Sequence, residues 1–196
     1  DISGVLYAAA GTPETMAVVA KMDIKPLIIP TSALRIALGG AQNYMRLRHD
    51  VGLAPVSTKL ALWVYCAETE QQARDGAERY MVEYTDSALR HYELGGTHFA
   101  NLEGYGGYAK MADIIRENDN GWRRSIVDGH PWGTPDKIID RVSTLAREFG
   151  TSEISFVFRY GSMPQATAEA SLRLFAKEVL PALHELETSP MELVAG

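Results

Sequence analysis

The turn from Ala8 to Thr15 contains residue types that could bind an anion. A strand of small residues ends there, Gly11 permits a tight turn, and Thr12 suits a helix N-cap with Pro13 at the first helical position. The amide groups and dipole of such a helix favour a negative charge above the strand end, and Thr15 adds a hydroxyl one turn later. The turn is therefore a candidate phosphate site, although an ordinary capped helix start has the same pattern.

A second candidate is the glycine-rich and aromatic segment from Gly95 to Tyr108, which contains His98. This composition suits a wall over a flat or apolar ligand, and His98 could act there as an acid, a base or a hydrogen-bond partner. A surface loop with an uninvolved histidine would look the same. We expect no metal site, because the histidines and the single cysteine, Cys66, are scattered without a ligand-like spacing.

Strand and helix patterns alternate along the chain and must position these candidates. Strands are predicted at 4–10, 26–30, 59–67 and 153–160, and helices at 13–22, 33–48, 68–92, from 134, and from 163. The long helix at 68–92 has a possible interruption near Thr85 and Asp86. Such alternation predicts an α/β protein with a parallel sheet and its site at the carboxyl ends of the strands.

The stretch at about 95–132 is long for a connection between such elements, which indicates a functional lid or an insertion. Residues 108–117 can form a short helix, whereas 118–131 is polar and is predicted as a loop. Trp132 and Gly133 are interpreted as the end of this insertion.

Length and composition favour a globular protein and argue against nucleic-acid-binding and membrane-spanning classes. The 196 residues, 46% hydrophobic and 22% charged, suit one globular domain over 1–196. A net charge of −6 without a basic cluster argues against a nucleic-acid partner, and no apolar run is long enough to cross a membrane. One cysteine excludes an internal disulfide, and with no signal pattern at the start we expect a reducing, cytoplasmic location.

Three pieces near the C-terminus resemble a known family in their order and spacing. They are GTPDKIIDRV at 133–142, EISFVFRYG at 153–161 and a helix ending FAKEVLPAL at 175–183. Together they are similar to the C-terminal end of the bacterial-luciferase-like, flavin-dependent monooxygenases. The resemblance implies a (β/α)8 TIM barrel, of which the four βα units here would form the second half. Another chain segment or a homo-oligomer would then supply the remaining half. A small open doubly wound sheet, complete as it stands, is the alternative.

The resemblance also implies a function. Members of this family use reduced FMN, delivered by a separate flavin reductase, and O2 to oxygenate a small organic substrate. Gly11, Thr12 and Thr15 match the turn that holds the FMN phosphate, although glycine replaces a carboxylate of the luciferase and proline enters the turn. Catalytic residues are expected mostly in the other half. The alternatives are hydride transfer with the deazaflavin coenzyme F420, a non-catalytic flavin-binding protein, or an inactive fragment.

Overall fold

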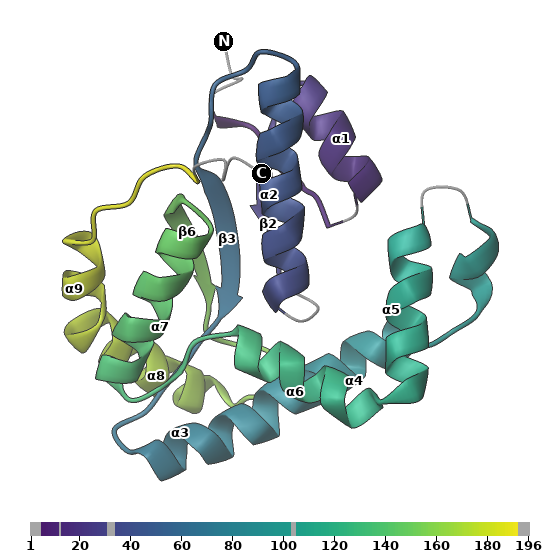
Figure 1. The fold of residues 1–196 in the computed structure, drawn as a ribbon. Helices are drawn as coiled ribbons and strands as arrows, with labels where there is room; N and C mark the ends of the chain where they lie inside the picture. The colour runs from purple at the N-terminus through teal and green to yellow at the C-terminus, as the bar shows by residue number, and fades with distance from the viewer. Residues whose placement is uncertain (1–4, 12, 31–33, 103–104, 192–196) are drawn as a thin grey trace.

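The computed structural model describes residues 5–11, 13–30, 34–102 and 105–191, and it has a parallel β-sheet at its centre (Figure 1). The sheet order is β1-β2-β3-β6, so the strands lie side by side in the order in which the chain visits them. The strands are β1 (Tyr7–Ala9), β2 (Lys25–Ile28), β3 (Thr58–Trp63) and β6 (Thr151–Val157). The predicted α/β class with a parallel sheet is therefore confirmed.

The strand predicted at 59–67 is divided at its carboxyl end. Beyond β3, the short strand β4 (Tyr65–Cys66) leaves the main sheet and pairs in parallel with β5 (Trp132–Gly133). Trp132 and Gly133 thus form part of a second, two-stranded sheet, where the sequence was interpreted only as the end of an insertion. The Tyr65 backbone amide donates to the Pro131 carbonyl, and the Ala67 amide donates to the Gly133 carbonyl.

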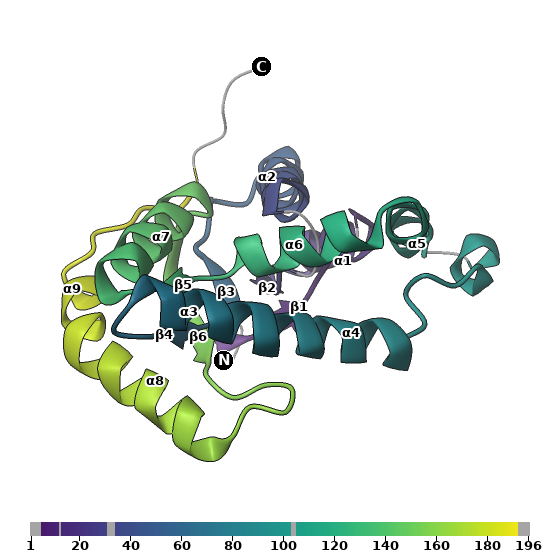
Figure 2. The same cartoon turned by 90° about the horizontal axis from the view of Figure 1, so that it is seen from below.

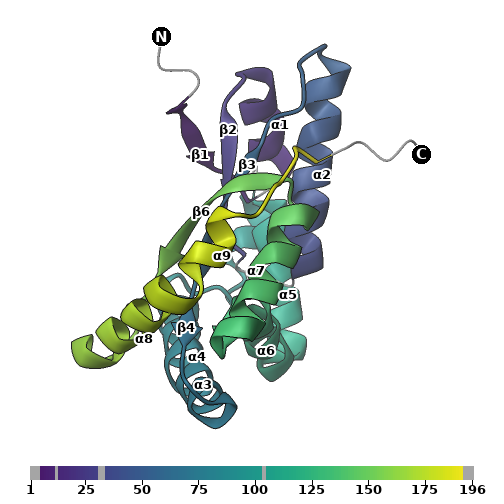
Figure 3. The ribbon, with the colours of Figure 1, turned by 90° about the vertical axis from the view of Figure 1, so that its left-hand side faces the viewer.

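Helices cover one face of the main sheet. Apolar side chains from alternate strand positions, such as Ile28, Leu60 and Leu62, pack against these helices because the face would otherwise expose them to water. Figure 3 shows α2 and α7 on the same side of β3 and β6. The helices next to the sheet are α1 (Pro13–Lys21), α2 (Leu34–Asp50), α7 (Pro135–Glu148), α8 (Gln165–Glu178) and α9 (Leu180–His184).

The opposite face of the sheet is more exposed to solvent. Lys59 and Ala61 of β3 are only half-buried, and Glu153, Ser155 and Val157 of β6 are exposed. In a closed barrel this face would be the interior. We call it the inner face, and we define it by Tyr7, Ala9, Lys25, Leu27, Lys59, Ala61, Trp63, Glu153, Ser155 and Val157.

A set of helices between β4 and β5 projects away from the sheet (Figure 2). We call this set the arm. It contains α3 (Glu70–Gly76), a π-helical turn (Ala77–Met81), α4 (Val82–His91), a 3-10 turn (His98–Asn101), α5 (Gly106–Glu117) and α6 (Asp119–Gly129). Among the described residues, no helix has the length and apolar character needed to span a membrane.

The polar loop predicted for 118–131 is wrong, because most of that segment is the helix α6. Asn118 caps this helix by accepting a hydrogen bond from the Gly121 amide at 2.8 Å. Trp122, Ile126 and Val127 then bury an apolar stripe in the core. The turn-like residues at the start of α6 therefore conceal an amphipathic helix, and the lid predicted at about 95–132 is largely helical.

The predicted interruption of the long helix also lies elsewhere. The π-helical turn at Ala77–Met81 precedes Thr85, whose hydroxyl donates to the Met81 carbonyl within a continuous α4. Gly76 comes directly before this turn and packs against the Tyr65 ring so closely that an added Cβ would lie 1.9 Å from it. The π-helical turn, which holds one residue more than a regular α-helical turn, therefore begins where Gly76 contacts Tyr65 of β4.

Candidate functional site

The candidate phosphate turn lies at the carboxyl end of β1. Gly11 follows the strand and is exposed, and a Cβ placed on it would meet no atom within 4 Å. α1 begins at Pro13, and Thr15 is half-buried in its first turn, while Thr12 lies outside the described residues. The open space above Gly11 and the start of α1 fit the binding of a phosphate group.

One charge opposes that role. Glu14 is the acidic residue in the first turn of α1, and its carboxylate weakens the attraction of the helix start for an anion. The Glu14 side chain is exposed, so solvent and salt screen its charge. In the role predicted for this turn, its backbone amide groups would contact the anion.

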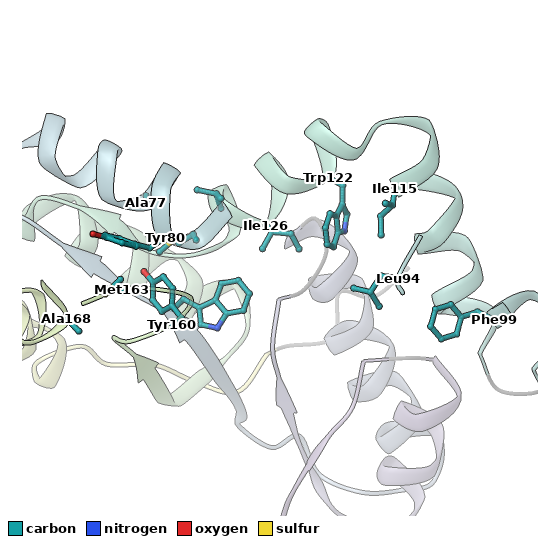
Figure 4. Packing of buried hydrophobic residues seen from close by; sticks show 13 residues of the cluster. Ala77, Tyr80, Leu94, Phe99, Ile115, Trp122, Ile126, Tyr160, Met163 and Ala168 are labelled. Carbon is teal, nitrogen blue, oxygen red and sulfur yellow. The ribbon is translucent and has the colours of Figure 1, made fainter. Parts of the chain in front are cut away.

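An aromatic cluster covers the carboxyl end of β3. The Trp63 ring centroid lies 4.2 Å from that of His130 and 4.6 Å from that of Tyr84, and Tyr160 lies 6.1 Å away. The Tyr160 hydroxyl donates to the Val64 carbonyl at 3.2 Å. Figure 4 shows Tyr160 at one end of the buried core that extends into the arm. The cluster forms a rigid apolar wall at the end of the sheet where α/β proteins bind their ligands.

His130 holds this wall to the neighbouring strand end. The Trp63 backbone amide donates to His130 Nδ1 at 3.2 Å, so the ring is neutral and carries its proton on Nε2. Burial lowers the pKa of His130 to about 3; the nearby Pro30 carbonyl acts in the opposite direction, and the charge of Arg141 adds to the lowering. His130 Nε2 has no hydrogen bond of ordinary geometry among the described residues, and the same holds for Trp122 Nε1.

A groove of about 520 Å³ adjoins the end of β4. Small and apolar residues, Ala67, Ala170 and Leu174, line it together with the polar side chains of Gln72 and Thr167. The buried Ser171 hydroxyl at its base accepts a hydrogen bond from the Cys66 amide at 2.8 Å. The groove could admit an apolar molecule with a few polar groups.

Cys66 itself is not a nucleophile. Its side chain is buried, and burial raises the pKa of its thiol to about 11, which keeps it protonated at neutral pH. Within the described part of the chain, no group of three or more histidine, cysteine, aspartate or glutamate residues could hold a metal ion.

The second predicted site residue, His98, belongs to the arm. Its side chain is 44% exposed, its ring packs on Phe99 at 3.9 Å, and its Nδ1 lies 4.0 Å from a Glu93 carboxylate oxygen. Gly96 leaves room for the ring, because a Cβ there would lie 2.6 Å from His98 Nδ1. His98 and Gly11 thus lie on separate elements, the arm and the end of β1.

No local sequence pattern indicates the Trp63–His130 pair. Trp63 was visible as a strand residue, but His130 was only one of five scattered histidines. The two residues are 67 positions apart, and only the pairing of β4 with β5 brings His130 back beside β3.

Comparison with known proteins bears on the fold. No protein-family model and no curated protein matches the sequence. Solved structures do match, among them monooxygenase RslO1 from Streptomyces bottropensis, with 22% identity, a TM-score of 0.57 and coverage of 90% of this chain and 47% of that one. The oxygenating constituent of 3,6-diketocamphane monooxygenase from the CAM plasmid of Pseudomonas putida, in complex with FMN, matches with 18% identity, a TM-score of 0.60 and coverage of 94% and 49%.

The chain has the luciferase-like fold. A third match of this kind is the coenzyme F420 dependent tetrahydromethanopterin reductase from Methanopyrus kandleri, with 15% identity, a TM-score of 0.55 and coverage of 90% and 50%. The chain spans about half the length of these structures. The resemblance predicted from the sequence is thereby confirmed at the level of the fold.

Proposed function

We propose that this chain is the second half of a luciferase-like barrel whose complete form is a flavin-dependent monooxygenase. The observation that carries the proposal is the open turn at Gly11, at the carboxyl end of the first strand of a fold shared with an FMN-bound monooxygenase. In this proposal the complete enzyme uses reduced FMN, supplied by a separate reductase, and O2 to oxygenate a small organic substrate.

Two features support the half-barrel. The strands β1-β2-β3-β6 follow chain order without the reversal that a doubly wound sheet has at its switch point. The inner face is also largely uncovered, as a barrel wall would be without the opposite wall. Both features speak against a small open sheet that is complete by itself.

In this proposal the turn at Gly11 and the aromatic wall have different roles. The backbone at Gly11, together with Thr12 and Thr15, holds the phosphate, and the wall of Trp63 and Tyr160 excludes water from the carboxyl end of the sheet. Bound FMN supplies the redox chemistry, so the residues of this half position and shield. His98 would act as a hydrogen-bond partner only in an arrangement that brings the arm over the bound ligand.

Coenzyme F420 is the second candidate cofactor, because one structural neighbour is an F420-dependent reductase. A phosphate-binding turn serves either cofactor, and the two differ in the ring system, which the other barrel half would contact.

The proposal is tested by replacing the turn. Gly11→Trp combined with Thr12→Ala fills the open space above the turn with an indole ring and removes a hydroxyl, so affinity for FMN should fall at least about tenfold, or 1.4 kcal/mol. Affinity for riboflavin, which lacks the phosphate, should change much less. Isothermal titration of both ligands measures the difference.

The matched control places the same two changes in the arm, as Gly106→Trp with Thr97→Ala. Both residues are exposed, and a Cβ on Gly106 meets no atom within 4 Å. The control should bind FMN like the wild type. If FMN affinity is unchanged in the turn variant, the phosphate site is not at Gly11.

A further inference from the structure

The groove at the end of β4 contains groups that the proposed flavin site does not use. β4 contacts both α3 and α8, and the groove of about 520 Å³ is lined by residues from these elements (Figure 2). Pockets that bind small organic molecules have volumes of roughly 300–1,000 Å³. The groove therefore has room for a small ligand of its own.

A buried hydroxyl at the base of the groove has a proton to donate. Ser171 is 2% exposed, and its Oγ accepts the Cys66 backbone amide at 2.8 Å. Among the described residues, no acceptor is hydrogen-bonded to the Ser171 hydroxyl proton, and the same holds for the hydroxyls of Tyr65 and Thr167, which also line the groove. A wholly apolar ligand would displace water from these hydroxyls without replacing its hydrogen bonds, which is unfavourable. A well-matched ligand therefore carries an oxygen that accepts from them.

The groove has one charged group, and that group is acidic. Among the described residues that line it, Glu68 has the only carboxylate, and none is lysine, arginine or histidine. The exposed Glu68 side chain forms no ion pair with another described residue, whereas the nearby Glu70 pairs with Lys137 at 2.8 Å. An unpaired carboxylate repels anions and attracts cations. The charged group of a matching ligand is therefore a cation.

The rest of the lining indicates which cation fits. Ala67, Ala170 and Leu174 contribute apolar surface. A hard metal ion needs several oxygen ligands, whereas the groove offers one carboxylate, and no group of metal-ligating residues occurs in the part of the chain that the structure describes. A protonated amine on a short hydrocarbon chain suits both the Glu68 carboxylate and the apolar surface.

We propose that this groove binds a small primary amine that also carries a hydroxyl or carbonyl oxygen. The ammonium group lies on the Glu68 carboxylate, the oxygen accepts from the Ser171 hydroxyl, and the hydrocarbon part covers Ala170 and Leu174. This binding site goes beyond the proposed flavin chemistry and does not depend on it.

The Cys66 amide provides a local reporter, because it donates to Ser171 at the base of the groove. The wild-type chain is titrated with the straight-chain amino alcohols from 3-amino-1-propanol to 6-amino-1-hexanol, and the Cys66 amide signal is followed by NMR. At least one of them should shift this signal saturably. The alkylamine and the alcohol of the same chain length each lack one of the two polar groups, so each should bind at least about threefold more weakly.

Two variants locate the binding. Glu68→Gln keeps the size of the side chain but removes its charge, so affinity for the amino alcohol should fall at least about threefold, while affinity for the alcohol should not change. Ala170→Trp fills the groove from an exposed helix position, so saturable binding should be lost. Glu117→Gln and Ala176→Trp are the matched controls, because both residues are exposed and lie outside the groove, and both variants should bind like the wild type.

Three results would each overturn the inference. They are a Cys66 signal that none of the amino alcohols shifts saturably, an unchanged affinity of Glu68→Gln for the amino alcohol, and tight binding by a folded Ala170→Trp variant. Circular dichroism checks folding, and Glu68→Gln, at an exposed position, keeps the test decisive if the tryptophan variant does not fold. The FMN titration uses a different ligand and a different turn, so failure here is distinguishable from failure of the proposed function.

Discussion

At the scale of single residues, His130 is a buried histidine whose pKa lies far below its ordinary value. A neutral, buried imidazole accepts a hydrogen bond from the Trp63 amide and supports the aromatic wall at the carboxyl end of β3. Its stability contribution must depend on pH, because the unfolded chain takes up a proton on this side chain near pH 6.5 and the folded chain does so only near pH 3.

The sign of this dependence follows from the lowered pKa. The contribution of His130 is fully present above about pH 6.5 and is lost progressively as the pH falls toward 3, by an amount on the order of a few kcal/mol. The variant His130→Asn keeps an acceptor for the Trp63 amide but cannot titrate. Its free energy of unfolding in urea should therefore fall less steeply between pH 6.5 and 4 than that of the wild type.

His49→Asn is the control, since the His49 side chain is 74% exposed and should leave the pH slope unchanged. Equal slopes for the wild type and His130→Asn would show that His130 is not buried in its neutral form.

At the scale of elements, the contact between α3 and β4 fixes the position of the arm. Gly76 meets the Tyr65 ring at the start of the π-helical turn, and no larger residue fits without a shift. Gly76→Ala should therefore destabilise the protein by about 1–3 kcal/mol through overpacking, although alanine is the better helix former.

Gly39 provides the comparison, because it lies inside α2 and a Cβ there meets no atom within 4 Å. Gly39→Ala should stabilise the protein by roughly 0.5–1 kcal/mol. Thermal and urea unfolding of both variants measure the contrast. Similar stabilisation by the two substitutions would mean that Gly76 does not touch Tyr65 as described.

The elements also show what the sequence could predict. The strand predicted at 59–67 and the helix predicted from 134 contain β3 and α7, because local pattern and burial agree there. α6 was missed because Asn118 and Gly121 look like a turn while acting as a helix start. The Trp63–His130 pair and the alignment of Lys59 with Glu153 on the inner face depend on strand pairing and register, which no local pattern contains.

At the scale of the whole molecule, three properties of the sheet and its strand ends belong together. The strands follow chain order, one sheet face is open and charged, and the turn at Gly11 lies at the carboxyl end with the Trp63 wall. The fold is that of structures about twice as long, among them an FMN-bound monooxygenase and an F420-dependent reductase. These properties are the basis of the proposal that this chain is a half-barrel and contributes the phosphate end of a flavin site.

An equilibrium titration of the wild-type chain with FMN and with F420, followed by absorbance, shows whether this half of the barrel binds a flavin. The account predicts saturable binding of FMN, with a shift of the flavin bands and weaker binding of riboflavin. Saturable binding of F420 without binding of FMN would favour the hydride-transfer alternative. Binding of neither by a chain that is folded by circular dichroism would contradict the account.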